Sequence, residues 1–169
     1  MIPLYQRLKQ VPGQGVVRWV GVRPVHGDPM VSLDQVTAVE ARGLEGDVAS
    51  QAKRVGKRQV TLVQAEHLPV LGSLLGRDAV TPGELRRNVV VSGINLVALA
   101  RLRFAVGDEV ILVGTGACAP CIRMDEILGE GGFHAVRGHG GITAQIERGG
   151  VIRVGDAVRV LGDEPASDD

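Results

Sequence analysis

The stretch VGDEVILV, residues 106–113, places a Gly-Asp pair beside a run of valine, isoleucine and leucine. Glycine and aspartate are favoured in tight turns, and β-branched side chains are favoured in strands, so this stretch predicts a β-hairpin. The same V-G-D-x-V core returns in VGDAVRVL, residues 154–161, and predicts a second hairpin. Two such hairpins indicate a fold rich in antiparallel strands.

Four further segments read as strands, because they are rich in valine and are bounded by turn residues. They are GVVRWVGVR, QVTAVEA, RQVTLVQ and NVVVSG, at residues 15–23, 35–41, 58–64 and 88–93. Two segments read as helices, QAEHLPVLGSLLG (64–76) and the shorter CIRMDEIL (121–128). In the first, Pro69 indicates a break or a late start. Its apolar stripe consists of Leu68, Leu71, Leu74 and Leu75.

The composition agrees with a β-rich fold around an aliphatic interior. Of 169 residues, 44% are hydrophobic but only 2% are aromatic, so valine, leucine, isoleucine and alanine must fill the core. The 24 glycines indicate many tight turns. We therefore predict a single domain over residues 1–162, mostly β with a few short helices, that forms a closed or nearly closed β-barrel. The acidic residues 163–169 are predicted to be a disordered tail.

The charges of the chain balance, since Lys plus Arg and Asp plus Glu each number 19. A general nucleic-acid-binding protein normally carries a basic excess, so we expect no nucleic-acid partner. Lysine occurs only at positions 9, 53 and 57, and the other cations are arginines, which suit bidentate recognition of carboxylate or phosphate. No segment has the apolar core of a signal peptide or the length of a membrane span, so we expect a cytoplasmic protein with reduced thiols.

Both cysteines lie close together, and three interpretations compete for them. With His134 and His139, Cys118 and Cys121 have the spacing C-x2-C-x12-H-x4-H, which could supply four zinc ligands. The pair could instead be a redox dithiol, although the βαβ context of thioredoxin-like folds is absent. In the third interpretation Cys121 is a single reactive thiol, because a helix start and the nearby Arg123 both favour the thiolate. Without any such role, both cysteines would simply be packed in the interior.

Six segments occur in an order that is shared with one known family. They are GLEGD (43–47), KRQVTLV (57–63), TPGELRRNVVVSGINL (81–96), RFAVGDEVILV (103–113), CAPCIRM (118–124) and GGVIRVGDAV (149–158). Together they resemble the MOSC domain, which is named for the C-terminal domain of molybdenum-cofactor sulfurases. The resemblance covers roughly residues 15–161 and implies a small stand-alone member with a β-barrel fold. It also implies binding of molybdenum cofactor (molybdopterin), or handling of sulfur on its way to a metal centre.

The resemblance further implies which residues form the site. The family's reactive cysteine corresponds by motif position to Cys121, which would be a molybdenum ligand or a carrier of persulfide sulfur. The segment ELRRN resembles the wall of the family's pocket. Its Arg86, Arg87 and Asn88 would provide hydrogen-bond donors for the phosphate at the end of the pterin cofactor.

Other candidates are less central in the resemblance. The glycine-rich segment VRGHGGITA contributes Arg137 and His139 as possible anion contacts. Arg123 is a further candidate for cofactor binding. Lys57 and the adjacent Arg58 are weaker candidates, because basic residues just before a strand are more often exposed on the surface. Cys118 is expected to assist Cys121, since C-x-x-C geometry allows a disulfide between them.

Three functions follow as hypotheses. In the leading one, the protein binds molybdenum cofactor or carries sulfur as a cysteine persulfide for cofactor maturation. The alternatives are a molybdenum-dependent reductase of N-hydroxylated compounds that works with a separate electron-donor protein, and a non-catalytic module that binds or stores cofactor. No pyridoxal-phosphate domain is recognised in this chain, so sulfur would come from a separate cysteine desulfurase. A monomer or small homo-oligomer is expected.

Overall fold

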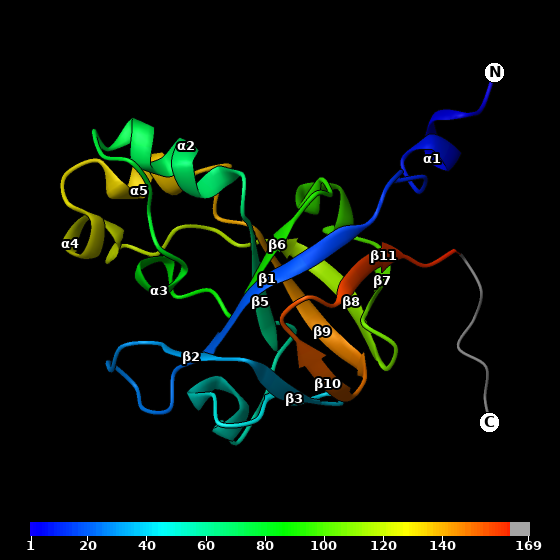
Figure 1. Ribbon diagram of the computed structural model, residues 1–169, viewed down its shortest axis with the longest axis horizontal. Helices are drawn as coiled ribbons and strands as arrows, with labels where there is room; N and C mark the ends of the chain where they lie inside the picture. The colour runs from blue at the N-terminus through cyan, green and yellow to red at the C-terminus, as the bar shows by residue number, and fades with distance from the viewer. Residues whose placement is uncertain (163–169) are drawn as a thin grey trace.

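The computed structural model describes residues 1–162 and shows a β-rich domain with most of its short helices gathered at one end (Figure 1). The predicted disordered tail, residues 163–169, lies outside the described residues. The strands are β1 (Gly15–Val22), β2 (Val31–Leu33), β3 (Gln35–Val39), β4 (Gly43–Leu44), β5 (Val60–Gln64), β6 (Val89–Ser92), β7 (Arg103–Val106), β8 (Val110–Ala117), β9 (Ile142–Arg148), β10 (Gly150–Arg153) and β11 (Ala157–Val160). The α-helices are α1 (Leu4–Arg7), α2 (His67–Leu74), α3 (Pro82–Leu85), α4 (Met124–Leu128) and α5 (Gly132–Val136), and the 3-10 helices are η1 (Val48–Gln51) and η2 (Leu96–Leu99).

Seven strands close into a barrel in the order β1–β11–β7–β8–β9–β5–β6, with β6 pairing back to β1. Neighbouring strands of the barrel are antiparallel, apart from β5 and β6, which run parallel. Strand β2 pairs with the end of β1, and β3 forms a small second sheet with β4 and β10. The closed barrel confirms the fold class that the sequence predicts.

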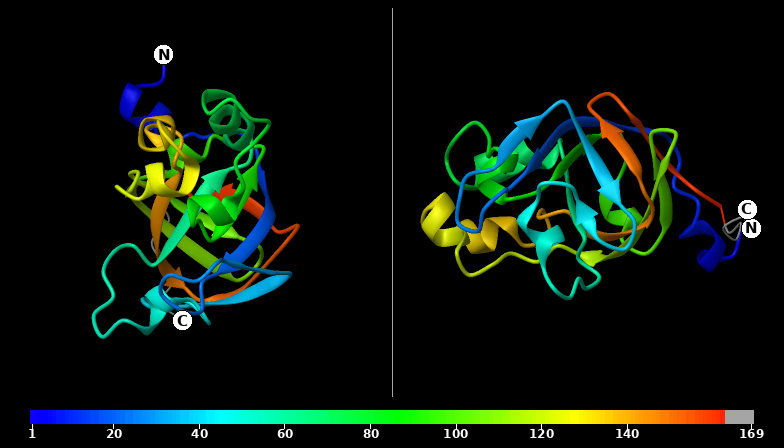
Figure 2. Two further views of the ribbon diagram at one scale, coloured as in Figure 1. Left: turned by 90° about the vertical axis from the view of Figure 1, so that its left-hand side faces the viewer. Right: turned by 90° about the horizontal axis from the view of Figure 1, so that it is seen from below.

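The parallel pair explains where the helices lie. Parallel neighbours need a crossover connection rather than a hairpin, and here the chain between β5 and β6 forms α2 and α3. Helices α4 and α5 lie between β8 and β9 in the chain, and α5 contacts α2 while α4 contacts α3. The four helices thus cluster at one end of the barrel, and α1 lies at the opposite end (Figures 1 and 2).

Two cores result from this arrangement, and β5 contributes to both. Its alternate residues Val60 and Leu62 face the barrel interior, where they join the main aliphatic core. Val63 faces the other way and packs beneath the helices with Leu71 of α2 and Leu85 of α3. Because both faces are covered, β5 is buried along nearly its whole length, as is typical of strands in parallel pairs.

The two predicted hairpins have different outcomes. Residues 106–113 form the turn and second strand of the antiparallel β7–β8 pair, which confirms the first. The second prediction was wrong, although Gly155 and Asp156 do form a turn between β10 and β11. β10 pairs with β3, whereas β11 pairs with β7 and β1, so the two arms of this turn belong to different sheets.

Both predicted helices exist but start later than their sequence segments. α2 begins at His67, in agreement with the late start that Pro69 indicated, but Leu74 of its expected apolar stripe is 58% exposed. α4 begins at Met124, so Cys121 lies in the loop before the helix and not in its first turn. None of the helices within residues 1–162 has the length and apolar character needed to cross a membrane.

Candidate functional site

A cleft lined by arginines lies at the edge of the barrel where β5 and β6 begin. Because these strands are parallel, the residues just before them, Arg58 and the Arg86–Asn88 segment, lie at the same edge. β1 is antiparallel to β6, so Arg23, which follows the end of β1, reaches this edge as well. Three adjoining cavities of about 100, 150 and 200 Å³ form the cleft, and Arg86 lines all of them.

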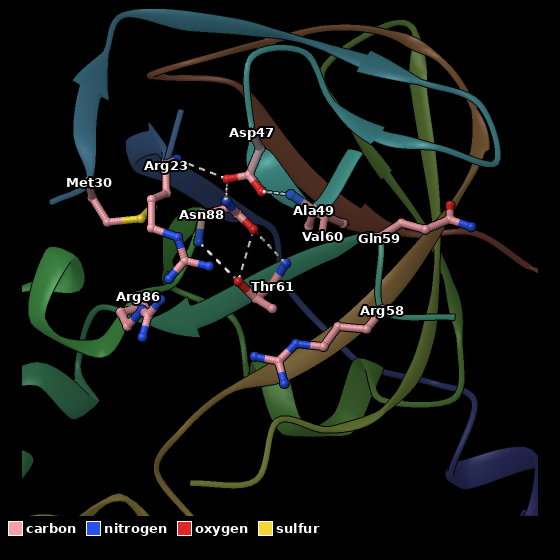
Figure 3. Close-up of a pocket in the computed structure, with 10 residues that line it drawn as sticks. All are labelled: Arg23, Met30, Asp47, Ala49, Arg58, Gln59, Val60, Thr61, Arg86 and Asn88. Atoms are coloured by element: carbon pink, nitrogen blue, oxygen red, sulfur yellow. Dashed lines mark hydrogen bonds between the residues drawn. The ribbon is translucent and has the colours of Figure 1, made fainter. Parts of the chain in front are cut away.

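The first cavity, of about 100 Å³, is built on a buried hydrogen-bond network (Figure 3). Asn88 donates from Nδ2 to the carbonyl oxygen of Gly21 at 3.2 Å and to Oδ2 of Asp47 at 3.0 Å. Its Oδ1 accepts from the backbone N–H of Thr61 at 3.2 Å and from the Thr61 hydroxyl at 3.0 Å. The side chain of Asn88 is therefore fully paired within the protein, and its role is to fix its neighbours in place.

Asp47 is the acidic member of this network and is 7% exposed. Besides Asn88, its carboxylate accepts from the backbone N–H of Arg23 at 3.0 Å and from that of Ala49 at 2.9 Å. The second of these bonds caps η1. Three hydrogen-bond donors hold this buried carboxylate in place. Asp47 therefore fixes the backbone at Arg23, from which the Arg23 side chain extends.

Arginine side chains face the same cavity. Figure 3 shows the guanidinium groups of Arg23, Arg58 and Arg86 turned toward one side of the Asp47–Asn88–Thr61 network. Nε of Arg23 is buried and has no hydrogen-bond partner within residues 1–162. Arg86 adopts the left-handed conformation, φ 58° and ψ 40°, where it ends α3. Residues other than glycine are strained there, and such strain often occurs at binding sites.

The second cavity, of about 150 Å³, contains the exposed cysteine. Cys121 lines it together with Arg23, Arg58, Arg86 and Arg87, and the remaining wall is Leu85, Ala119 and Met124. The arginines thus come from three separate chain segments, and the thiol comes from a fourth. A thiolate is both a soft metal ligand and a nucleophile, and guanidinium groups bind anions, so the side chains that suit both kinds of chemistry line one cavity.

Arg87 is the most buried of these arginines, with 3% of its surface exposed. Its Nε donates to the carbonyl oxygen of Gly140 at 2.7 Å, and its Nη1 donates to that of Leu85 at 2.7 Å. Nη2 is buried but has no partner among the described residues. The pKa of Arg87 is lowered, chiefly by burial and also by the nearby Arg58, although electrostatic interaction with Cys118 and, more weakly, with Cys121 opposes the shift. The guanidinium group is therefore oriented by the backbone, with one donor still available beside the thiols.

The other predicted site residues lie at varying distances from this cleft. Cys118 is 3% exposed and packs in the interior, where its backbone N–H donates to Gly141. Arg123 lines the third cavity with Arg86 and forms an ion pair with Glu126 at 3.3 Å. Lys57, Arg137 and His139 do not line any of the three cavities.

His139 contacts a different group. Its ring lies against that of His67 in an edge-to-face contact, with the ring centroids 5.4 Å apart. Its Nδ1 is 3.0 Å from the carbonyl oxygen of Ala135. It precedes Gly140, so it supports the segment that orients Arg87 and does not itself face the cleft. Within residues 1–162 no three His, Cys, Asp or Glu side chains are grouped to hold a metal ion, so the C-x2-C-x12-H-x4-H spacing does not form a zinc site.

Sequence reasoning missed Asp47 and Arg23 in the cleft and undervalued Arg58. Asp47 ends the GLEGD segment, and an aspartate beside a tight turn was the available signal that its carboxylate could accept backbone hydrogen bonds there. Arg23 had no local signal, because only the pairing of β1 with β6 brings it to the cleft. Arg58, not the adjacent Lys57, lines two of the cavities.

Residues 23–159 match the MOSC domain. The fold is similar to that of YuaD from Bacillus subtilis, with a TM-score of 0.79 and 18% identity over 92% of this chain and 100% of YuaD. It is also similar to YiiM from Escherichia coli, with a TM-score of 0.67 and 15% identity over 90% of this chain and 72% of YiiM.

YiiM from Geobacillus stearothermophilus is similar to the same extent, with a TM-score of 0.67 and 14% identity over 90% of this chain and 78% of that protein. A comparison with curated proteins gave no match. The MOSC match spans most of the chain, and the seven-stranded barrel agrees with these structures. The chain therefore belongs to the MOSC domain family.

Proposed function

We propose that this protein binds molybdenum cofactor, or carries sulfur toward it as a persulfide, with Cys121 as the working thiolate. MOSC domains are associated with molybdenum cofactor in general. The observation that carries the proposal is that the exposed Cys121 shares a cavity with Arg87, whose Nη2 is buried and unpaired within the described residues.

The residues of the cleft fit such a cofactor chemically. A phosphate group requires several N–H donors, and Arg23 and Arg87 each retain a buried donor without a partner in residues 1–162. Molybdenum accepts soft thiolate ligands, and Cys121 is an accessible thiol in the same cavity. Each cavity alone is smaller than the ~300 Å³ of typical ligand pockets, but the three share walls, so an extended ligand could span them. When bound, the cofactor would supply redox or sulfur chemistry at its metal.

The protein's own contribution is binding and orientation. The Asp47–Asn88 pair fixes the backbone before Arg23, and Gly140 and Leu85 fix the plane of the Arg87 guanidinium. These contacts hold the donors in place before a ligand arrives, so little conformational entropy is lost on binding. Cys118 supports the loop from the interior and is shielded from solvent.

The test is anaerobic exposure of the wild type, Cys121→Ala and Cys118→Ala to molybdenum cofactor, followed by desalting and quantification of bound molybdenum and pterin. Near one-to-one retention that is lost in Cys121→Ala alone would support thiolate ligation. Retention in all three proteins would contradict ligation and favour a storage module held by the arginines. No retention by the wild type would remove the cofactor half of the proposal and leave persulfide carriage, which is tested separately below.

Cofactor-loaded protein would then be tested for activity. Reduction of an N-hydroxylated compound with an artificial electron donor would favour the reductase alternative, with a separate reductase as the natural partner. Sulfur transfer from a cysteine desulfurase to Cys121, without such turnover, would favour the sulfur carrier.

A further inference from the structure

The cavity around Cys121 is strongly cationic and has no acidic wall. Four of its eight lining residues are arginines, and none is aspartate or glutamate. Asp47 lines the neighbouring first cavity, where its carboxylate already accepts three hydrogen bonds. An electrophile that reaches Cys121 in this cavity should therefore be anionic.

The size of the cavity restricts that anion further. At about 150 Å³ it is roughly half the lower limit of pockets that enclose drug-sized ligands. A small oxyanion fills such a space, whereas a pterin would have to extend into the adjoining cavities. The cavity thus has the size and charge for a compact dianion beside a nucleophilic sulfur.

The arginines provide donors that the protein itself leaves unused. Nη2 of Arg87 and Nε of Arg23 are buried and have no partner within residues 1–162, and both side chains line this cavity. A buried N–H group without a partner is costly, so unpaired guanidinium nitrogens on a cavity wall indicate an oxygen-rich ligand. Only 3% of the Arg87 surface is exposed, so solvent does not satisfy its unpaired Nη2 donor.

We propose that a thiosulfate-type oxyanion occupies this cavity and loads Cys121 with sulfane sulfur, which makes the protein a thiosulfate sulfurtransferase. The proposal deepens the sulfur-carrying half of the function proposed above and rests on it. The arginines bind the sulfonate oxygens, and the outer sulfur of the ligand faces the Cys121 thiolate.

The reaction balances without an added oxidant or reductant. The Cys121 thiolate attacks the outer sulfur of thiosulfate, a new S–S bond forms at Sγ, and the S–S bond of thiosulfate breaks. Its electron pair leaves with sulfite, so one thiolate and one thiosulfate dianion give one persulfide anion and one sulfite dianion. A nucleophilic acceptor, such as cyanide in the assay, then takes the outer sulfur as thiocyanate and regenerates the thiolate.

The experiment incubates reduced wild-type protein with thiosulfate and measures the gain of one sulfur atom by intact-protein mass spectrometry. Addition of cyanide then measures release of thiocyanate. We expect loading of the wild type and none of Cys121→Ala. The exposed Arg58 can be changed without disturbing the core, and Arg58→Gln should load about tenfold more slowly, because it removes one charged donor. Arg159→Gln, an exposed arginine on β11 away from the cleft, is the matched control and should load like the wild type.

Three outcomes would overturn the proposal. In the first, thiosulfate fails to load the wild type while inorganic polysulfide loads Cys121, so that sulfur carriage stands but the donor class is wrong. In the second, Arg58→Gln loads as fast as the wild type and the Arg159→Gln control, so the cationic wall of the cavity does not recognise the donor. In the third, neither thiosulfate nor polysulfide loads the wild type, whereas sulfur delivery by a cysteine desulfurase and retention of molybdenum cofactor are measured independently.

Discussion

Nδ2 of Asn88 lies 3.0 Å from Oδ2 of Asp47, a hydrogen bond that joins the start of β6 to the segment between β4 and η1. The bond connects two walls of the first cavity and, through the backbone N–H of Arg23, a third. The cleft is therefore supported by a buried polar network, in which the loss of one member leaves others without partners.

Replacement of Asn88 by alanine should destabilise the fold. Asn88→Ala removes four side-chain hydrogen bonds and leaves the buried Thr61 hydroxyl and Asp47 carboxylate underpaired, at a cost of about 2–4 kcal/mol in the free energy of unfolding. Urea denaturation measures the difference. Asn95→Ala is the control, because Asn95 is exposed and its side chain makes no capping bond. Equal stability of the two variants would show that the network contributes little.

The strained backbone at Arg86 should separate stability from binding. Arg86→Gly and Arg86→Ala both remove the guanidinium that lines all three cavities, so both should weaken anion binding about tenfold. Glycine adopts φ 58° without strain, so the glycine variant should be about 1 kcal/mol more stable than the alanine variant. Urea denaturation and thiosulfate titration measure the two effects. An alanine variant as stable as the glycine variant would contradict the assigned strain.

Cys121 should discriminate between charged and neutral alkylating agents. The surrounding arginines attract iodoacetate, so the ratio of its rate to that of iodoacetamide should exceed the ratio measured for the unfolded protein in urea. Cys118 should remain unmodified in the folded protein, because it is 3% exposed. Mass spectrometry of tryptic peptides locates the label. A ratio unchanged on folding would mean that the arginines exert no effective field at the thiol.

Gly140 should not tolerate a side chain. A Cβ atom there would lie 2.5 Å from the carbonyl oxygen of Cys118 and 3.1 Å from Nη2 of Arg87, so Gly140→Ala must displace one of them. We expect a loss of about 1–3 kcal/mol in stability together with weaker anion binding. Gly56→Ala is the control, since nothing lies within 4 Å of the added Cβ. A Gly140→Ala protein with wild-type stability and binding would contradict the described packing.

The partly buried His67, which lies against His139, should make stability depend on pH. Burial lowers the pKa of His67, and the nearby His139 lowers it further. As pH falls through the unfolded-state pKa of about 6.5, the unfolded chain binds a proton that folded His67 does not yet accept. The stability that neutral His67 contributes is thus fully present above this pH and is lost below it.

Between about pH 7.5 and about pH 5.5 the wild type should therefore lose more stability than His67→Gln, as measured by urea denaturation. His26→Gln, which changes an exposed histidine, serves as the control and should behave like the wild type. Parallel pH profiles for the wild type and His67→Gln would exclude His67 as the source of the pH dependence.

Local patterns predicted individual strands but not their partners. The VGDEVILV turn formed a hairpin because its strands are adjacent in the barrel, whereas the matching VGDAVRVL turn sends its strands to different sheets. Turn chemistry specifies a chain reversal and does not determine which strand is the neighbour. β9 was overlooked although Ile142, Ala144 and Ile146 alternate with more polar residues, which was the available signal.

The candidate site shows the same limit. The resemblance identified Cys121 and the ELRRN segment, and Arg87 and Cys121 do line one cavity. Arg23 could not be found by spacing, because only the pairing of β1 with β6 brings it to the cleft. Asp47 carried a turn signal in GLEGD, but its hydrogen bond to Asn88 depends on tertiary structure. Arg137 and His139 were proposed as anion contacts from the glycine-rich segment of the resemblance, but neither lines the three cavities of the cleft.

The parallel pairing of β5 with β6 also has a consequence for the order of folding. The β7–β8 hairpin can form early, because its contacts are local, but β5 and β6 can meet only after the intervening crossover segment has closed. Arg58 and Arg87 become neighbours at that step, and Arg23 joins them when β1 docks on β6. We therefore expect the cationic cleft to form among the last steps of folding, so that a nascent or partly unfolded chain does not bind an anionic ligand beside Cys121.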